Sequence, residues 1–85
     1  MVIGTQIVDT MPPHAVIDYY TWGWSPAWDV VWMVVPTSTT PGQPQVEWNV
    51  AVERSPTNTV TYHVTITNLT ASSVGVEGRY AIMNL

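Results

Sequence analysis

Three tryptophans lie in one short stretch, Trp22, Trp24 and Trp28. Of all residues in this sequence, their type and spacing are best suited to binding a ligand. The flat face of an indole stacks on the apolar CH face of a sugar ring, and its Nε1–H donates a hydrogen bond outward. In a regular strand, residues 22 and 24 point to the same side, with a glycine between them. Nearby Asp18 and Asp29 supply carboxylates that accept hydrogen bonds from sugar hydroxyls. These five residues predict a lectin-like carbohydrate-binding site.

The same indoles have a second, structural interpretation. The chain contains five tryptophans and no phenylalanine, so tryptophan is the only very large apolar side chain available to fill its interior. In this interpretation, Trp28, Trp32 and Trp48 lie in the core. Trp24 is expected to be exposed, because it adjoins Pro26 in a predicted loop and loops lie on surfaces.

Catalysis is not indicated by the other polar residues. The only imidazoles are His14 and His63, the six carboxylates are scattered, and no G-x-S-x-G motif is present. Paired catalytic carboxylates need a cleft that a chain of 85 residues barely supplies. With no cysteine and no calcium-loop spacing, the sequence predicts no metal site and no cofactor. We expect a non-enzymatic protein, with a small hydrolase that uses His14 or His63 as an alternative.

Charge and hydropathy restrict the classes of partner. Charged residues make up only 9% of the chain, lysine is absent and the net charge is −4. This negative charge repels phosphate groups, so neither nucleic-acid binding nor attraction to an anionic membrane is expected. The sequence has no run of about 18 apolar residues, and residues 1–10 lack the basic start and apolar core of a signal peptide. We expect a soluble, acidic protein without membrane insertion; its location is not indicated.

The size of the chain favours a homo-oligomer. Small folds are usually supported by disulfides, metal ions or oligomerisation, and the first two are not indicated here. The residues Val31, Met33 and Val35 form one apolar row and are the predicted oligomer interface. The alternative is that this row is covered by the N-terminal strand or by the loop at residues 36–44.

The secondary structure that positions these residues is predicted most clearly for residues 45–85. Between residues 60 and 67, apolar side chains alternate with threonine and histidine, which is typical of a strand with one buried face. Residues 46–53 and 74–82 alternate in the same way. We predict a three-stranded meander whose apolar face is covered by the upstream half of the chain.

Three further strands are predicted upstream, at residues 2–8, 15–24 and 28–35. The segment 28–35 is apolar on both faces, which is typical of a strand covered on both sides. A helix is the competing interpretation, but the flanking prolines and the β-branched content favour a strand. Six strands at this spacing predict a single all-β domain, residues 1–85, folded as an antiparallel β-sandwich or a partly open barrel.

Residues 62–68 (Tyr-His-Val-Thr-Ile-Thr-Asn), a polar turn and Val74-Gly75-Val76 resemble the strand–turn–strand of bacterial immunoglobulin-like adhesion modules. The resemblance covers about a quarter of the chain and implies a β-sandwich; no functional residue is carried over. In that turn, Asn68-Leu69-Thr70 matches the N-glycosylation triplet. The sequence as a whole predicts a non-enzymatic carbohydrate-binding module. The alternative is a structural subunit whose apolar strands serve only self-assembly.

Overall fold

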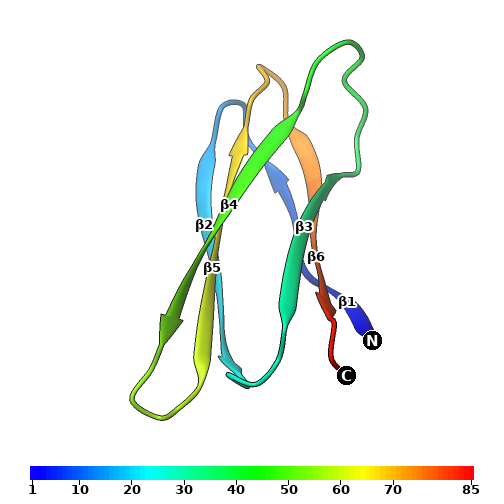
Figure 1. The fold of residues 1–85 in the computed structure, drawn as a ribbon. Helices are drawn as coiled ribbons and strands as arrows, with labels where there is room; N and C mark the ends of the chain where they lie inside the picture. The colour runs from blue at the N-terminus through cyan, green and yellow to red at the C-terminus, as the bar shows by residue number, and fades with distance from the viewer.

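The computed structural model describes all 85 residues and contains six β-strands and no helix (Figure 1). The strands are β1 (Val2–Met11), β2 (Val16–Trp24), β3 (Val30–Pro36), β4 (Val46–Arg54), β5 (Val60–Asn68) and β6 (Val74–Ile82). Each segment with a strand pattern in the sequence is therefore a strand. The structure has no helix that is long and apolar enough to cross a membrane.

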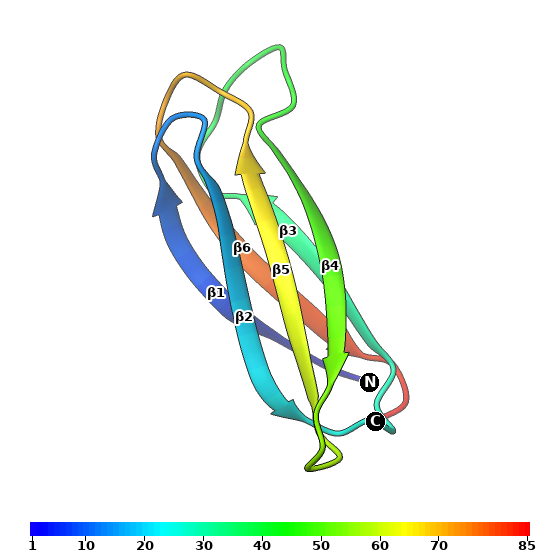
Figure 2. The ribbon, with the colours of Figure 1, turned by 90° about the vertical axis from the view of Figure 1, so that its left-hand side faces the viewer.

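The strands form two antiparallel sheets that pack face to face (Figure 2). Sheet A has the order β1-β6-β3, and sheet B has the order β2-β5-β4. The sheets share no strand and are not joined by backbone pairing at either edge, so the alternative of a partly open barrel is excluded. The predicted all-β antiparallel sandwich of six strands is confirmed.

The predicted meander of residues 45–85 is only partly right. β4 and β5 form a hairpin in sheet B, but β6 lies in sheet A between β1 and β3. β5 and β6 are thus the central strands of opposite sheets and face each other across the sandwich. A period-two pattern specifies which face of a strand is buried, not which strand lies beside it, so the crossing between sheets was not readable from the pattern.

The core lies between the two central strands. The most deeply buried apolar side chains come from these strands and the end of β1: Met11, Val64, Ile66, Val74 and Val76. Another part of the core is aromatic, where Trp24 meets Trp32, Tyr62 and Tyr80 edge-on with ring centroids 5.1–5.7 Å apart. Such edge-to-face contacts add to the stabilisation that comes from burial. The expectation that Trp32 lies in the core is confirmed.

β4 is not covered by the upstream half of the chain. Its apolar row pairs with buried residues of β5 and so faces inward, yet Trp48, Val50 and Val52 are 39%, 37% and 62% exposed. Figure 1 shows why: β3 and β4 are edge strands of opposite sheets, and they diverge from the loop that joins them. The expectation that Trp48 lies in the core is therefore wrong.

Asn68 holds two loops together at one end of the sandwich. Its Nδ2 donates to the backbone carbonyls of Met11 (3.3 Å), Pro12 (3.0 Å) and Ser72 (2.8 Å). Its Oδ1 accepts from both the backbone N–H and the hydroxyl of Thr70, each at 2.9 Å. Because this amide is buried and its hydrogen-bonding capacity is used, the glycosylation triplet does not present an accessible acceptor in the folded chain.

Candidate functional site

A β-bulge in β2 sends the first two tryptophans to opposite faces of sheet B. β2 pairs with β5 in continuous register as far as Thr21, and the register shifts before Trp24. Gly23 lies in this bulge with a φ of +82°, a left-handed conformation that glycine adopts without steric strain. The extra residue leaves Trp22 exposed on the outer face and turns Trp24 into the core. The expectation that both side chains share one side is therefore wrong.

Trp24 and Trp28 pack against the core, although parts of both rings line an open hollow next to Trp22. Trp24 is only 8% exposed, and its Nε1 donates to Thr21 Oγ1 at 3.1 Å. Trp28 is half-buried against the core and meets Trp24 edge-on, with ring centroids 6.2 Å apart. The expected exposure of Trp24 is wrong. The placement of Trp28 agrees with the structural interpretation of the indoles.

The two predicted carboxylates lie in different parts of the fold. Asp29 immediately precedes β3 of sheet A, where its backbone N–H donates to Asn84 Oδ1 at 2.9 Å. Asp18 lies on β2, in register with Thr65 of β5. The five predicted site residues are therefore divided. Trp22, Trp24 and Trp28 line one open hollow of about 320 Å³ at the end of β2, whereas Asp18 shares the outer face of sheet B with Trp22 alone.

The outer face of sheet B consists of three parallel columns of side chains. The columns are Val16, Asp18, Tyr20 and Trp22 on β2; Thr67, Thr65, His63 and Thr61 on β5; and Glu47, Asn49, Ala51 and Glu53 on β4. None of these side chains is buried. The face thus has aromatic groups along one edge, hydroxyl groups in the middle and acidic or amide groups along the other edge.

The two aromatic side chains on this face are unusually accessible. Tyr20 is 61% exposed and Trp22 is 70% exposed. Their ring centroids are 5.9 Å apart, with 36° between the ring planes. On its other side Tyr20 stacks on the imidazole of His63, with centroids 5.8 Å apart and 26° between planes. The ring of Tyr20 therefore lies next to both Trp22 and His63 on an exposed surface.

The polar groups beside these rings hold one another in place. His63 Nδ1 lies 3.1 Å from Asp18 Oδ2, and the hydroxyl of Thr65 donates to Asp18 Oδ1 at 3.5 Å. Because a carboxylate can only accept, Nδ1 carries the hydrogen in this pair. A shallow hollow of about 190 Å³ lies alongside, lined in part by Glu47, Asn49 and Thr67. The outer face of sheet B has three carboxylates and no arginine, since Arg54 is on the inner row of β4 and Arg79 is on sheet A.

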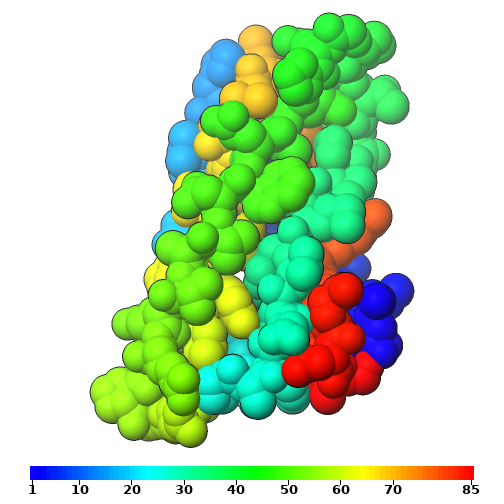
Figure 3. All heavy atoms as spheres, viewed as in Figure 1, coloured from blue at the N-terminus to red at the C-terminus, as the bar shows by residue number.

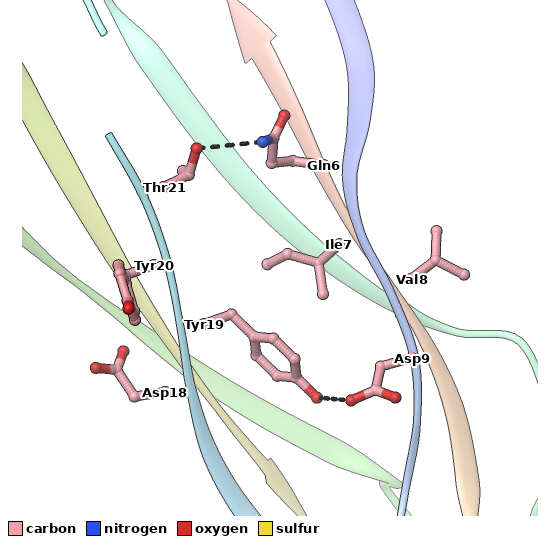
Figure 4. Close-up of a pocket in the computed structure, with 8 residues that line it drawn as sticks. All are labelled: Gln6, Ile7, Val8, Asp9, Asp18, Tyr19, Tyr20 and Thr21. Atoms are coloured by element: carbon pink, nitrogen blue, oxygen red, sulfur yellow. Dashed lines mark hydrogen bonds between the residues drawn. The ribbon is translucent and has the colours of Figure 1, made fainter. Parts of the chain in front are cut away.

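A second cavity, of about 410 Å³, lies along the seam between β1 and β2. Figure 4 shows Tyr19 and Thr21 pointing across this seam, while Asp18 and Tyr20 point to the other side of β2. Two hydrogen bonds close the seam: Tyr19 donates to Asp9 Oδ2 at 2.6 Å, and Gln6 Nε2 donates to Thr21 Oγ1 at 3.2 Å. Burial, and then the adjacent Asp9 carboxylate, raise the pKa of the Tyr19 phenol well above its usual value.

The predicted interface row lies on the outer face of sheet A. Val31 and Met33 are about half exposed, and Val35 is half-buried. The N-terminal strand does not cover the row, because β1 lies in the same sheet with β6 between it and β3. The row flanks the ion pair of Arg79 with Glu77, at 3.1 Å, on β6.

Sequence reasoning missed Tyr20, His63 and Thr65 as parts of one surface. A signal for Tyr20 was present, because Asp18, Tyr20 and Trp22 alternate along one side of the predicted strand. No signal placed β5 next to β2, since these strands are far apart in the chain and their pairing is set by the sheet topology.

Comparison of the chain with protein-family models, curated proteins and solved structures gives no match. The likeness of residues 62–76 to immunoglobulin-like modules therefore rests on the two-sheet architecture alone. Within that architecture, β5 and β6 face each other from opposite sheets and do not pair as neighbours.

Proposed function

We propose that this protein is a non-enzymatic module that binds a neutral carbohydrate on the outer face of sheet B. Tyr20 and Trp22 form the stacking surface for sugar rings. Asp18, with His63 and Thr65 beside it, supplies the hydrogen-bonding groups for sugar hydroxyls. The site keeps the chemistry predicted for Trp22 and Asp18 but replaces the two inward-facing tryptophans with Tyr20 and the polar column of β5.

The exposure of Trp22 is the observation that carries this proposal. Burying a large apolar side chain stabilises a fold by about 1.5–3 kcal/mol, yet Trp22 continues the outer row of β2 and lies in solvent beside a second exposed ring. Flat aromatic faces next to polar groups suit sugars, which present an apolar CH face and a rim of hydroxyl groups. This combination supports a carbohydrate ligand over a purely apolar one.

The charges on the outer face of sheet B favour neutral sugars over acidic ones. Asp18, Glu47 and Glu53 are acidic, and no arginine or lysine lies on the outer face of sheet B. Carboxylated and sulfated sugars are therefore repelled, while neutral sugars find several acceptors. The arrangement of carboxylates also favours binding over hydrolysis. Glycosidic cleavage needs two carboxylates that flank the scissile bond, whereas Asp18 lies on one edge strand of the sheet and Glu47 and Glu53 lie on the other.

A glycan array of neutral and acidic sugars, followed by calorimetric titration with the neutral oligosaccharide that gives the strongest signal, tests the proposal. Trp22→Ala is expected to weaken binding at least about tenfold, equivalent to about 1.4 kcal/mol, because it removes the main stacking surface. Trp48→Ala is the matched control: it removes another exposed indole, but from the inner row of β4, and keeps the affinity per site. Equal affinities for both variants, or no neutral glycan bound at all, would refute the proposal.

Self-assembly through sheet A is the second candidate function. It is favoured by the exposure of Val31 and Met33 together with Ile3 and Val8, which are 74% and 77% exposed on the same outer face. A face of this kind suits packing against a second copy. Sedimentation of Met33→Asp tests it: a decrease in mass relative to the wild type supports assembly through this face, and an unchanged mass contradicts it.

A further inference from the structure

β4 leaves both its inner face and its backbone edge uncovered. It is nine residues long and pairs with β5 without a bulge or a proline. All of its residues except Val46 are exposed, and its inner row contains Trp48, Val50 and Val52. Natural sheets usually protect such an edge with charged side chains, proline or a bulge. The charged residues of β4, Glu47, Glu53 and Arg54, lie near its two ends, so its uncharged centre, residues 48–52, is a template for another strand.

The edge strands of the two sheets meet along two sides of the sandwich, β1 with β2 and β3 with β4. The two sides differ in their side-chain contacts. Between β1 and β2, the side-chain bonds Tyr19–Asp9 and Gln6–Thr21 bridge the seam. No hydrogen bond or ion pair between side chains joins β3 to β4. Figure 3 faces this second side and shows a hollow between the green atoms of β4 and the teal atoms of β3. β3 approaches β4, but Trp48, Val50 and Val52 of the inner row remain exposed.

We propose that β4 pairs with β4 of a second copy, antiparallel and about a twofold axis. The backbone groups needed for this pairing are free. Ser55 donates to Thr59 O and Leu69 donates to Gln45 O, each at 2.9 Å, so the odd-numbered residues of this strand bond to β5. The N–H and C=O groups of the even-numbered residues then point to the open edge. A second β4 satisfies them and places its own apolar row beside that of the first copy, where cross-strand side chains contact each other.

Side-chain complementarity selects the register that places Ala51 opposite Ala51 of the second copy. On the inner side, Val50 then faces Val52, and Trp48 faces Arg54, a pairing suited to a cation–π contact. On the outer side, Asn49 faces Glu53. A register centred on Val50 instead places Glu47 opposite Glu53, and like charges directly opposite each other destabilise a sheet.

This pairing produces a six-stranded sheet with both outer faces of sheet B on the same side. The two β2 strands are then five strand spacings apart, roughly 24 Å at about 4.8 Å per spacing. If the proposed carbohydrate site is correct, the dimer presents two such sites in one plane and gains avidity for clustered glycans. The pairing itself does not depend on the proposed function.

Cysteine cross-linking tests the pairing and its register. The chain has no cysteine, so Ala51→Cys introduces the only thiol. In the proposed register the two Cys positions form a non-hydrogen-bonded pair with Cα atoms about 4.5 Å apart, within the range of a disulfide. Asn49→Cys is the matched control on the same exposed face. In the proposed register, position 49 of one copy is offset by four residues along the strand from position 49 of the other, roughly 13 Å. A disulfide does not span this distance.

Under mild oxidation, A51C is expected to migrate as a covalent dimer of twice the 9.4 kDa monomer mass, and N49C as a monomer. Adding Val52→Lys to A51C places a charge in the apolar row and is expected to abolish the cross-link. Adding Val16→Lys, at an equally exposed valine on the opposite edge of sheet B, is expected to leave it intact. A monomeric A51C, a cross-link that survives Val52→Lys, or N49C cross-linking as well as A51C would overturn the proposal. A failure of glycan binding alone does not affect it.

Discussion

The direction in which each tryptophan points decides what this surface can do. The sequence shows that some indoles have to fill the core, and Trp24 and Trp32 do so while Trp22 is exposed. It does not predict which indole plays which part, because period two assigns Trp22 and Trp24 to the same side. The left-handed φ of Gly23 reverses that assignment. A glycine between two tryptophans is compatible with both a regular strand and a bulge, so the sequence pattern did not distinguish them.

Tyr19 provides a test at the scale of a single residue. Its folded pKa is raised above the ordinary value of 10.0, first by burial and then by its bond to Asp9. The stabilisation is therefore present below pH 10 and is lost as the pH rises toward the folded pKa. Tyr19→Phe is expected to lower the free energy of unfolding at neutral pH by about 1 kcal/mol and to reduce its decline at alkaline pH. Burial, and then Asp29, raise the pKa of Tyr62 as well, so part of the decline remains.

Urea denaturation at a series of pH values between neutral and about pH 11 measures both effects. Tyr20→Phe is the control for the hydrogen bond, because it removes a phenol hydroxyl of the same strand that has no hydrogen bond in the structure. An alkaline decline as steep in Tyr19→Phe as in the wild type would contradict the assigned role of Tyr19.

At the scale of the elements, central strands were predicted more reliably than edge strands. β5 alternates between buried and half-buried residues along its whole length, as its sequence pattern indicates. β4 has the same type of pattern, yet its apolar row is exposed because β3, the edge strand of sheet A on that side, diverges from it. The pattern reports the side on which apolar residues lie. It does not report whether another element covers that side, which depends on the arrangement of the sheets.

Asn68 tests how the loops at one end are held. Asn68→Ala is expected to lower the free energy of unfolding by about 3 kcal/mol, because it removes several hydrogen bonds of a buried amide, including that of the Thr70 backbone N–H. Asn49→Ala, at an exposed asparagine of the same sheet, is the matched control and is expected to change it by less than about 0.5 kcal/mol. Thermal or urea unfolding measures both variants. A loss below about 1 kcal/mol for Asn68→Ala would show that the loops are held mainly by other contacts.

At the scale of the whole molecule, the sandwich presents two outer faces of different character. The outer face of sheet B combines exposed rings with hydroxyl and carboxylate groups, whereas that of sheet A is apolar around one ion pair. The number of strands and the fold class followed from periodicity and turn residues. The assignment of strands to sheets did not, because five of the six strands pair with segments distant in the chain, such as β1 with β6 and β2 with β5. The candidate site depends on that topology, since His63 and Thr65 reach Asp18 only through the pairing of β5 with β2.

The indole N–H resonances of the five tryptophans, followed by NMR during titration with the best-binding neutral oligosaccharide, test the carbohydrate site most directly. Each indole reports on its own environment, and the outer face of sheet B contains only one of them. The Trp22 signal is expected to shift progressively until saturation, while the signals of buried Trp24 and Trp32 stay in place. A stationary Trp22 signal in the presence of saturating ligand, or shifts centred on Trp24 and Trp28, would contradict the proposed site.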